Sequence, residues 1–221
     1  VNWRGVILET SLGVLITPYS VLAGQAFTIL SRPAGQHATR VISVFALEDR
    51  PDKVCEMLVR VASQLPQCHP DLTPIAVPIG DLKYRTKIPL RSPGDDGDAE
   101  ADFRRWIWYA SRREGLHLDE AEDVFHDPAA IREAIRTVVA PTLRLSGEQQ
   151  QAMAPHATIE RYGAGELISA TGVVPEAMSF IMAGTVLLIA DGEDGSRTEG
   201  GSLHPGGFLG QSTLIRYPVT G

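Results

Sequence analysis

The pattern of apolar residues between Thr39 and Glu114 constrains the fold of this chain most. A run rich in β-branched residues, Thr39–Leu47, predicts a buried strand. Apolar residues with helical spacing follow it, at Val54, Leu58, Val61, Ala62 and Leu65. Bulky or β-branched residues alternate over Leu82–Leu90, which predicts a second strand, and a second helix is expected from about Ala101 to Glu114, with Gly115 after its end. The order strand, helix, strand, helix predicts an α+β sandwich.

Three short strand-like runs precede this unit. They are Val6–Glu9, Val14–Thr17 and Phe27–Ser31. Turn-forming residues separate them, namely Gly13, Pro18 and Gly24. Such short strands with tight turns suit a small barrel or meander, in which closure removes exposed edges. The segment Ser31–Gly35 breaks the pattern and marks the first domain boundary.

The chain after residue 122 begins with helices and then becomes mainly strand-like. Asp127 and Pro128 are a typical helix start, and the apolar face of this connector helix is expected to end at Pro141. The segment Ser146–Gln149 has the pattern of a capping box for a short helix, Glu148–Ala154. Short strands are then predicted at residues 158–162, 166–170, 178–182 and 185–190, with a hairpin turn at 191–195.

The composition narrows the class of protein. With 221 residues and 43% apolar side chains, the chain is expected to fold around substantial cores. Its net charge of −7 is spread along the sequence, which argues against nucleic acid as a partner.

The sequence contains no run that could span a membrane. The longest apolar stretch, Gly13–Leu30, is interrupted by polar residues, whereas a membrane span needs about 20 apolar residues. Cys55 and Cys68 match neither a disulfide framework nor zinc spacing, which indicates a reducing cytoplasm. Because a strand begins close to Val1, we expect the natural protein to extend upstream.

No residue pattern typical of a catalytic or metal site is found. The sequence has no Ser-His-Asp, Cys-His or paired-carboxylate arrangement and no phosphate-binding loop, so we expect neither enzyme activity nor a metal. The acidic segment from His117 to His126 is interpreted as a solvated helix entry. The segment Asp95–Asp98 lacks the distant glutamate of a calcium loop and is interpreted as part of a polar loop, Arg91–Glu100.

Aromatic side chains crowd the second predicted helix. They are Phe103, Trp106, Trp108 and Tyr109, and they wrap around much of its circumference. This distribution predicts burial against both a sheet and a neighbouring subunit. Burial entirely within one chain is the alternative.

The first half of the chain resembles the small-conductance mechanosensitive (MscS) family of channels. The resemblance to the middle β-domain of that family runs from Val1 to Pro33, with Pro18-Tyr19-Ser20 where members usually have proline-asparagine-serine. The helix start Pro51–Val54 and the segment Phe103–Leu116 resemble the α/β domain that forms the cytoplasmic vestibule.

The C-terminal third resembles the cyclic-nucleotide-binding jelly roll. The matching motifs are Leu145–Gln149, Arg161–Glu166, Gly172, Phe180–Val186 and His204–Gln211. Gly165, Gly172 and Gly184 are expected at tight turns, where glycine tolerates a positive φ. Channels that combine both modules are similar to the bacterial cyclic-nucleotide-gated branch of the MscS family.

Together, the resemblances imply a fold class and a function. The expected fold is mixed, with four parts: a small β-barrel-like (Sm-like) domain at 1–34, an α+β vestibule domain at 35–122, a connector helix at 123–144 and a truncated cyclic-nucleotide-binding-type β jelly roll at 145–221. The implied function is that of the cytoplasmic part of an MscS-like ion channel in the inner membrane, with a regulatory C-terminal domain. The implied partners are further copies of the chain in a ring, a heptamer in this family, and the membrane through helices upstream of Val1.

The second resemblance also implies a ligand site. In that family, the stretch matching Phe208–Leu214 is a short helix whose first amides face the cyclic phosphate. The implied ligand-binding residues are Gly210, Gln211, Ser212, Thr213 and Arg216. Gln211 replaces the glutamate that binds the ribose, and the phosphate-binding arginine position falls at Val219 or Thr220. Because losing a charge-assisted pair costs roughly 1.5–3 kcal/mol, a cyclic nucleotide, the one cofactor implied, is predicted to bind weakly or not at all.

Two other functions fit the same motifs. A soluble cyclic-nucleotide-responsive regulator requires tight nucleotide binding, whereas a channel requires a cyclic oligomer. A scaffold that uses a degenerate jelly roll only for packing fits the missing arginine. Ligand titration and assembly measurements separate these functions.

Overall fold

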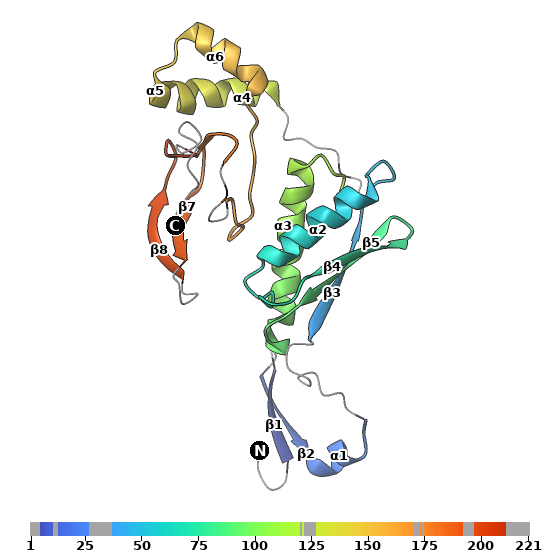
Figure 1. Cartoon of the computed structure of the whole chain (residues 1–221). Helices are drawn as coiled ribbons and strands as arrows, with labels where there is room; N and C mark the ends of the chain where they lie inside the picture. Colours follow the sequence, from blue (N-terminus) through green and yellow to red (C-terminus); the bar gives the residue numbers. More distant parts are fainter. Residues whose placement is uncertain are drawn as a thin grey trace.

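The computed structural model of the chain describes residues 5–10, 13–26, 37–119, 121, 127–169, 173, 175–191 and 197–210 (Figure 1). These residues form a mixed α and β structure with four small antiparallel sheets. The mixed fold class expected from the sequence is confirmed. The expected barrel closure is not seen, because none of the sheets closes on itself within the described ranges.

The best-packed part of the molecule is an α/β unit between Ala38 and Arg113. Its elements are β3 (Ala38–Val44), α2 (Pro51–Gln64), β4 (Ile75–Gly80), β5 (Lys83–Pro89), the 3-10 helix η1 (Pro93–Asp95) and α3 (Asp96–Arg113). The strand order is β3-β5-β4, and α2 and α3 cover one face of this sheet (Figure 1). On β5, the alternating residues Tyr84, Thr86 and Ile88 are buried, and Tyr84 and Ile88 belong to the hydrophobic core. The largest fully buried side chains of that core are Phe45, Met57, Leu58, Phe103 and Trp106.

Strand β4 lies at an edge of this sheet and has no counterpart among the predicted elements. Its sequence, IAVPIG, does not alternate, and Pro78 cannot donate a ladder hydrogen bond. The pairing of β4 with β5 shifts register between Pro78 and Gly80. Leu82 was predicted to begin the next strand but lies in the hairpin turn with a φ of 58°.

Helix α3 begins before the predicted position. The prediction placed residues 91–100 in a polar loop, yet η1 starts at Pro93 and α3 starts at Asp96. The side chain of Ser92 accepts a hydrogen bond from the Gly94 N–H and caps η1. The acidic residues that suggested a loop favour the positive end of a helix dipole, which explains the longer helix. Gly115 follows the helix with a φ of 66°, as expected of a C-terminal glycine.

The N-terminal segment is a hairpin followed by one short helix. Strands β1 (Gly5–Thr10) and β2 (Gly13–Pro18) pair along their whole length, and α1 (Tyr19–Ala23) follows at once. The first two predicted strands are confirmed. The third, Phe27–Ser31, lies outside the described residues.

The connector helix continues past Pro141, the residue at which its apolar face was expected to end. It consists of α4 (Pro128–Ala134), a π-helical turn η2 (Ile135–Val139) and α5 (Ala140–Leu143). Asp127 caps α4 by accepting the N–H of Ala129, as predicted. Proline lacks an N–H and crowds the preceding turn, and the wider π turn next to it lets the helix continue. The helix ends at Arg144, which is left-handed with a φ of 55°.

The described part of the C-terminal third contains four strands, of which two lie where strands were predicted, at 178–182 and 185–190. Helix α6 (Gly147–Met153) has the predicted capping box between Ser146 and Gln149, and the 3-10 helix η3 (Ala154–His156) extends it. Strand β6 (Ser179–Phe180) pairs with β9 (Phe208–Leu209), and β7 (Val186–Asp191) pairs with β8 (Arg197–Leu203).

Two expectations for this third are wrong over the described residues. The segments 158–162 and 166–169 form no strand, because the first of them packs against α3 instead of pairing, as described below. Phe208 and Leu209 were expected to begin a short helix but belong to a strand. Gly165 and Gly184 have the predicted positive φ, whereas Gly172 lies outside the described residues. None of the described helices has the length and apolar character needed to cross a membrane.

Candidate functional site

Only the first of the predicted ligand-binding residues can be located. Gly210 follows β9 with a φ of 87°, which is not the helical conformation expected for this stretch. Gln211, Ser212, Thr213 and Arg216 lie outside the described residues. Strand β9 leads to Gly210 and pairs with β6. The rings of Phe180 and Phe208 on these two strands stack, with centroids 5.7 Å apart and an interplanar angle of 30°.

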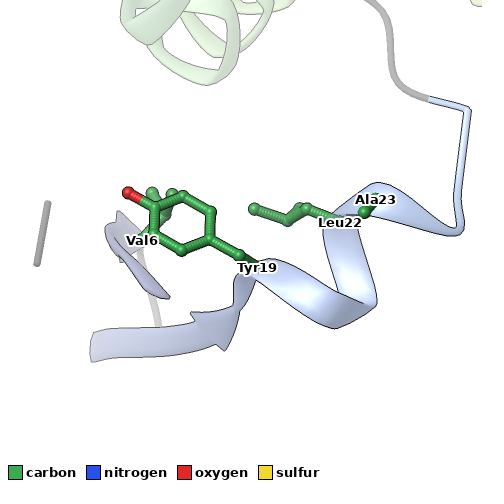
Figure 2. A pocket seen from close by; sticks show the side chains of 4 residues that line it. All are labelled: Val6, Tyr19, Leu22 and Ala23. Carbon is green, nitrogen blue, oxygen red and sulfur yellow. The ribbon is translucent and has the colours of Figure 1, made fainter. Parts of the chain in front are cut away.

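A shallow apolar hollow lies beside the N-terminal hairpin. It has a volume of about 490 Å³ and is lined by Val6, Tyr19, Leu22 and Ala23 (Figure 2). The side chain of Leu22 points toward the ring of Tyr19. The lining offers one phenolic hydroxyl and no acid, amine or thiol, so it suits packing rather than chemistry.

His117 pairs with a buried carboxylate rather than with a metal. Its Nδ1 atom lies 2.9 Å from Oδ1 of Asp49, whose side chain is 3% exposed. The other oxygen of Asp49 accepts the backbone N–H groups of His117 and Ala46. This carboxylate therefore ties the loop before α2 to the chain after α3. Among the described residues, no group of three or more histidine, cysteine, aspartate or glutamate side chains could hold a metal ion.

The most developed polar arrangement joins α3 to the segment Arg161–Glu166. We call this arrangement the α3 contact. It begins on the aromatic side of α3, where the Nε1–H of Trp106 donates to the carbonyl oxygen of Ala164 at 3.1 Å. Trp106 is 2% exposed, so this hydrogen bond satisfies an indole that would otherwise be buried without a partner.

Gly163 allows the segment to approach α3 closely. A Cβ atom at this position would lie 3.0 Å from Cδ1 of Trp106 and 3.2 Å from Cδ2 of Tyr109. Glu166 donates its backbone N–H to the carbonyl oxygen of Gly163, which closes a tight turn, and Gly165 in that turn has a φ of 78°. The glycines therefore serve the packing of this turn against two aromatic rings.

An ion pair at the end of α3 completes the contact. The guanidinium of Arg113 donates to both carboxylate oxygens of Glu166, a bidentate geometry that suits arginine. The side chain of Glu166 is 1% exposed and that of Arg113 is 15% exposed. Oε2 of Glu166 also accepts the N–H of Gly163 at 2.8 Å. The buried negative charge is thus balanced by one cation and one backbone N–H.

Arg113 has two further partners in the same segment. Its Nη1 donates to the carbonyl oxygen of Arg161 at 2.7 Å, and its Cζ lies 4.1 Å from the centre of the Tyr162 ring. The hydroxyl of Tyr162 donates to Glu160 at 2.7 Å. Burial, and after it the hydrogen bond to Glu160, raises the pKa of Tyr162 above its usual value, so this hydroxyl stays protonated as a donor.

The aromatic residues of α3 divide between the two sides of the helix. Phe103 and Trp106 are buried in the core of the α/β unit, and Trp106 and Tyr109 also lie beside Gly163. Trp108 is 40% exposed, with the guanidinium of Arg112 3.9 Å from the centre of its ring. Trp106 and Tyr109 thus meet a later segment of the same chain, whereas Trp108 is not buried. The predicted contact with a neighbouring subunit is not tested by a single chain.

We expect the ion pair between Arg113 and Glu166 to be strongly coupled. Arg113→Met and Glu166→Gln each leave one charged or polar group buried without its partner, so each should lower the free energy of unfolding by about 3–5 kcal/mol. The double variant should lose less than the sum of the two. Denaturant unfolding of the four proteins measures the coupling.

The matched control for this cycle is Arg105→Met. It breaks the exposed pair with Asp102 on the same helix and should cost at most about 1 kcal/mol. If the two single variants behave like this control, or if their effects simply add, the contact has no such coupling.

Known protein families and curated proteins offer no match for this chain. The resemblances to MscS channels and to cyclic-nucleotide-binding domains therefore stand on the motifs quoted for them.

Proposed function

We propose that this chain is the cytoplasmic, non-enzymatic part of an MscS-like ion channel and that its C-terminal domain regulates the channel. The order of the motifs supports this proposal, since vestibule-like segments precede cyclic-nucleotide-binding-like ones. In this proposal the small β-domain is Sm-like, and the C-terminal part is a jelly roll of the cyclic-nucleotide-binding type. The N-terminal hairpin suits assembly with other copies, because a lone two-stranded hairpin is marginally stable in water.

The observation that carries the regulatory role is the α3 contact. A regulatory domain can change the state of a channel only if its own changes are transmitted to the α/β unit. The buried ion pair of Arg113 and Glu166 offers that connection, because a shift of the turn at Gly163 would uncover or unpair a charged group. Because the ion pair is either formed or broken, such a connection transmits a switch between two states rather than a gradual change.

The exposed apolar residues of the hairpin also support assembly in a ring. Val14, Leu15 and Ile16 are each more than half exposed, although they lie on consecutive positions of β2. Residues on both faces of one strand are therefore open to water. In the proposed ring, neighbouring hairpins pair and cover these residues.

The proposed assembly predicts a closed set of crosslinked species. The full-length natural protein should be found in the membrane fraction, and chemical crosslinking there should give a ladder of subunits that ends at one ring size. Recovery of the full-length protein as a monomer outside the membrane would contradict the channel and would instead suit a soluble regulator.

The substitutions in the ligand site predict weak binding of cyclic nucleotides. Calorimetry of the full-length protein with cyclic AMP and cyclic GMP should give no binding or a dissociation constant of roughly millimolar order, because Gln211 lacks a charge and no arginine occupies Val219 or Thr220. Micromolar or tighter binding would overturn this prediction. In that case Arg216 would be the substitute cation, and Arg216→Ala would abolish the binding.

A further inference from the structure

The outer face of the three-stranded sheet carries a row of cations. Helices α2 and α3 cover the inner face, and the outer face stays open (Figure 1). On the central strand β5, the residues that alternate with the buried ones are Lys83, Arg85 and Lys87, and all three are exposed. Arg40 on β3 is exposed too, and it lies directly opposite Lys87 in the ladder. We call these four residues the basic face.

Apolar residues flank the basic face on both sides. Ile42 lies opposite Arg85 on β3, and Ile75 lies opposite Lys87 on β4. These isoleucines are 48% and 53% exposed. The cations suit an acidic partner, because opposite charges steer and orient two surfaces as they meet, and the exposed isoleucines add apolar area that such a contact would bury.

The basic face has no acidic partner of its own. Within the described part of the chain, none of its four residues forms an ion pair or a side-chain hydrogen bond. The cations that do form ion pairs lie elsewhere and are Arg50, Lys53, Arg60, Arg104, Arg105, Arg113 and Arg136. Like charges directly opposite on neighbouring strands, as at Arg40 and Lys87, destabilise a sheet. A bound anionic surface would remove that cost.

The first turn of α3 supplies the complementary charge. Asp96 and Asp98 lie there and are exposed, and Asp95 is the N-cap residue; Oδ1 of Asp96 also lies 3.6 Å from Nε2 of His37. No ion pair joins these aspartates to the basic face in the described chain, because α3 packs on the opposite face of the sheet. Within the described residues these charges stay apart, and a contact between two copies would bring them together.

We propose that the basic face binds the acidic first turn of α3 in a second copy of this chain. This contact is head-to-tail, since a different surface of each copy takes part, and head-to-tail contacts generate rings when the rotation closes. The inference rests on the ring in the proposed function and adds a definite pair of surfaces to it. It is separate from the pairing of the N-terminal hairpins.

The test is a charge-reversal experiment in the full-length protein, read by crosslinking in membranes. Arg85→Glu with Lys87→Glu should reduce the crosslinked species roughly tenfold or more, and so should Asp95→Lys with Asp96→Lys. A chain that carries all four substitutions should restore the ladder, because each acidic sheet then faces a basic turn at every contact, whatever the number of subunits in the ring. The matched control is Arg132→Glu with Arg144→Glu, an equal change of charge on the connector, and it should leave the ladder intact.

The outcomes separate this inference from the ring itself. A normal ladder in both double variants would overturn the proposed surfaces and leave the ring standing. A wild-type protein with no ladder would overturn the ring and this inference together. If each double variant fails to assemble and the chain with all four substitutions fails too, although circular dichroism shows these variants folded, the pairing of these two surfaces is wrong. Binding of polyglutamate to a monomeric wild-type protein through Arg85 and Lys87 would assign the face to a different acidic partner.

Discussion

The carboxylate of Glu166 is almost completely withdrawn from water, and the position of the C-terminal segment on the α/β unit depends on how that charge is balanced. Arg113 neutralises it, the N–H of Gly163 binds it, and the ring of Tyr162 lies under the guanidinium. A buried ion pair of this kind adds little net stability compared with apolar packing, but losing one partner is costly. The main effect of the pair is therefore to favour one docked position of the C-terminal segment, because other positions would leave a buried charge without its partner.

Helix α3 contacts both the core of the α/β unit and the C-terminal segment. Phe103 and Trp106 pack in the core of the α/β unit, and the indole N–H of Trp106 also reaches Ala164 in the C-terminal segment. A displacement of that segment thus reaches the core through one rigid side chain. The connector before it contains the π-helical turn η2 next to Pro141, a geometry that commonly occurs at functional sites.

The sequence predicts the α/β unit well because the spacing of its apolar residues matches the positions that are buried in the structure. The alternation along β5 and the stripe of α2 both reflect a single buried face, which is a strong local signal. The edge strand β4 lacks that signal because Pro78 interrupts it. The contact between Arg113 and Glu166 lies between residues 53 positions apart, and no local pattern encodes such a distance. The glycines of the segment Arg161–Glu166 predict a turn. They do not predict that this turn packs on two aromatic rings.

The most direct test of this account is the hydrogen exchange of the Trp106 indole N–H, followed by NMR. In the docked state this hydrogen is bound to Ala164 and buried, so it should exchange slowly. Gly163→Val places a branched side chain against Trp106 and Tyr109 and should speed the exchange by roughly tenfold or more, while the core amides of α2 stay protected. Rapid exchange of this hydrogen in the wild-type protein, or an unchanged rate in the variant, would contradict the claim that this segment is docked on α3.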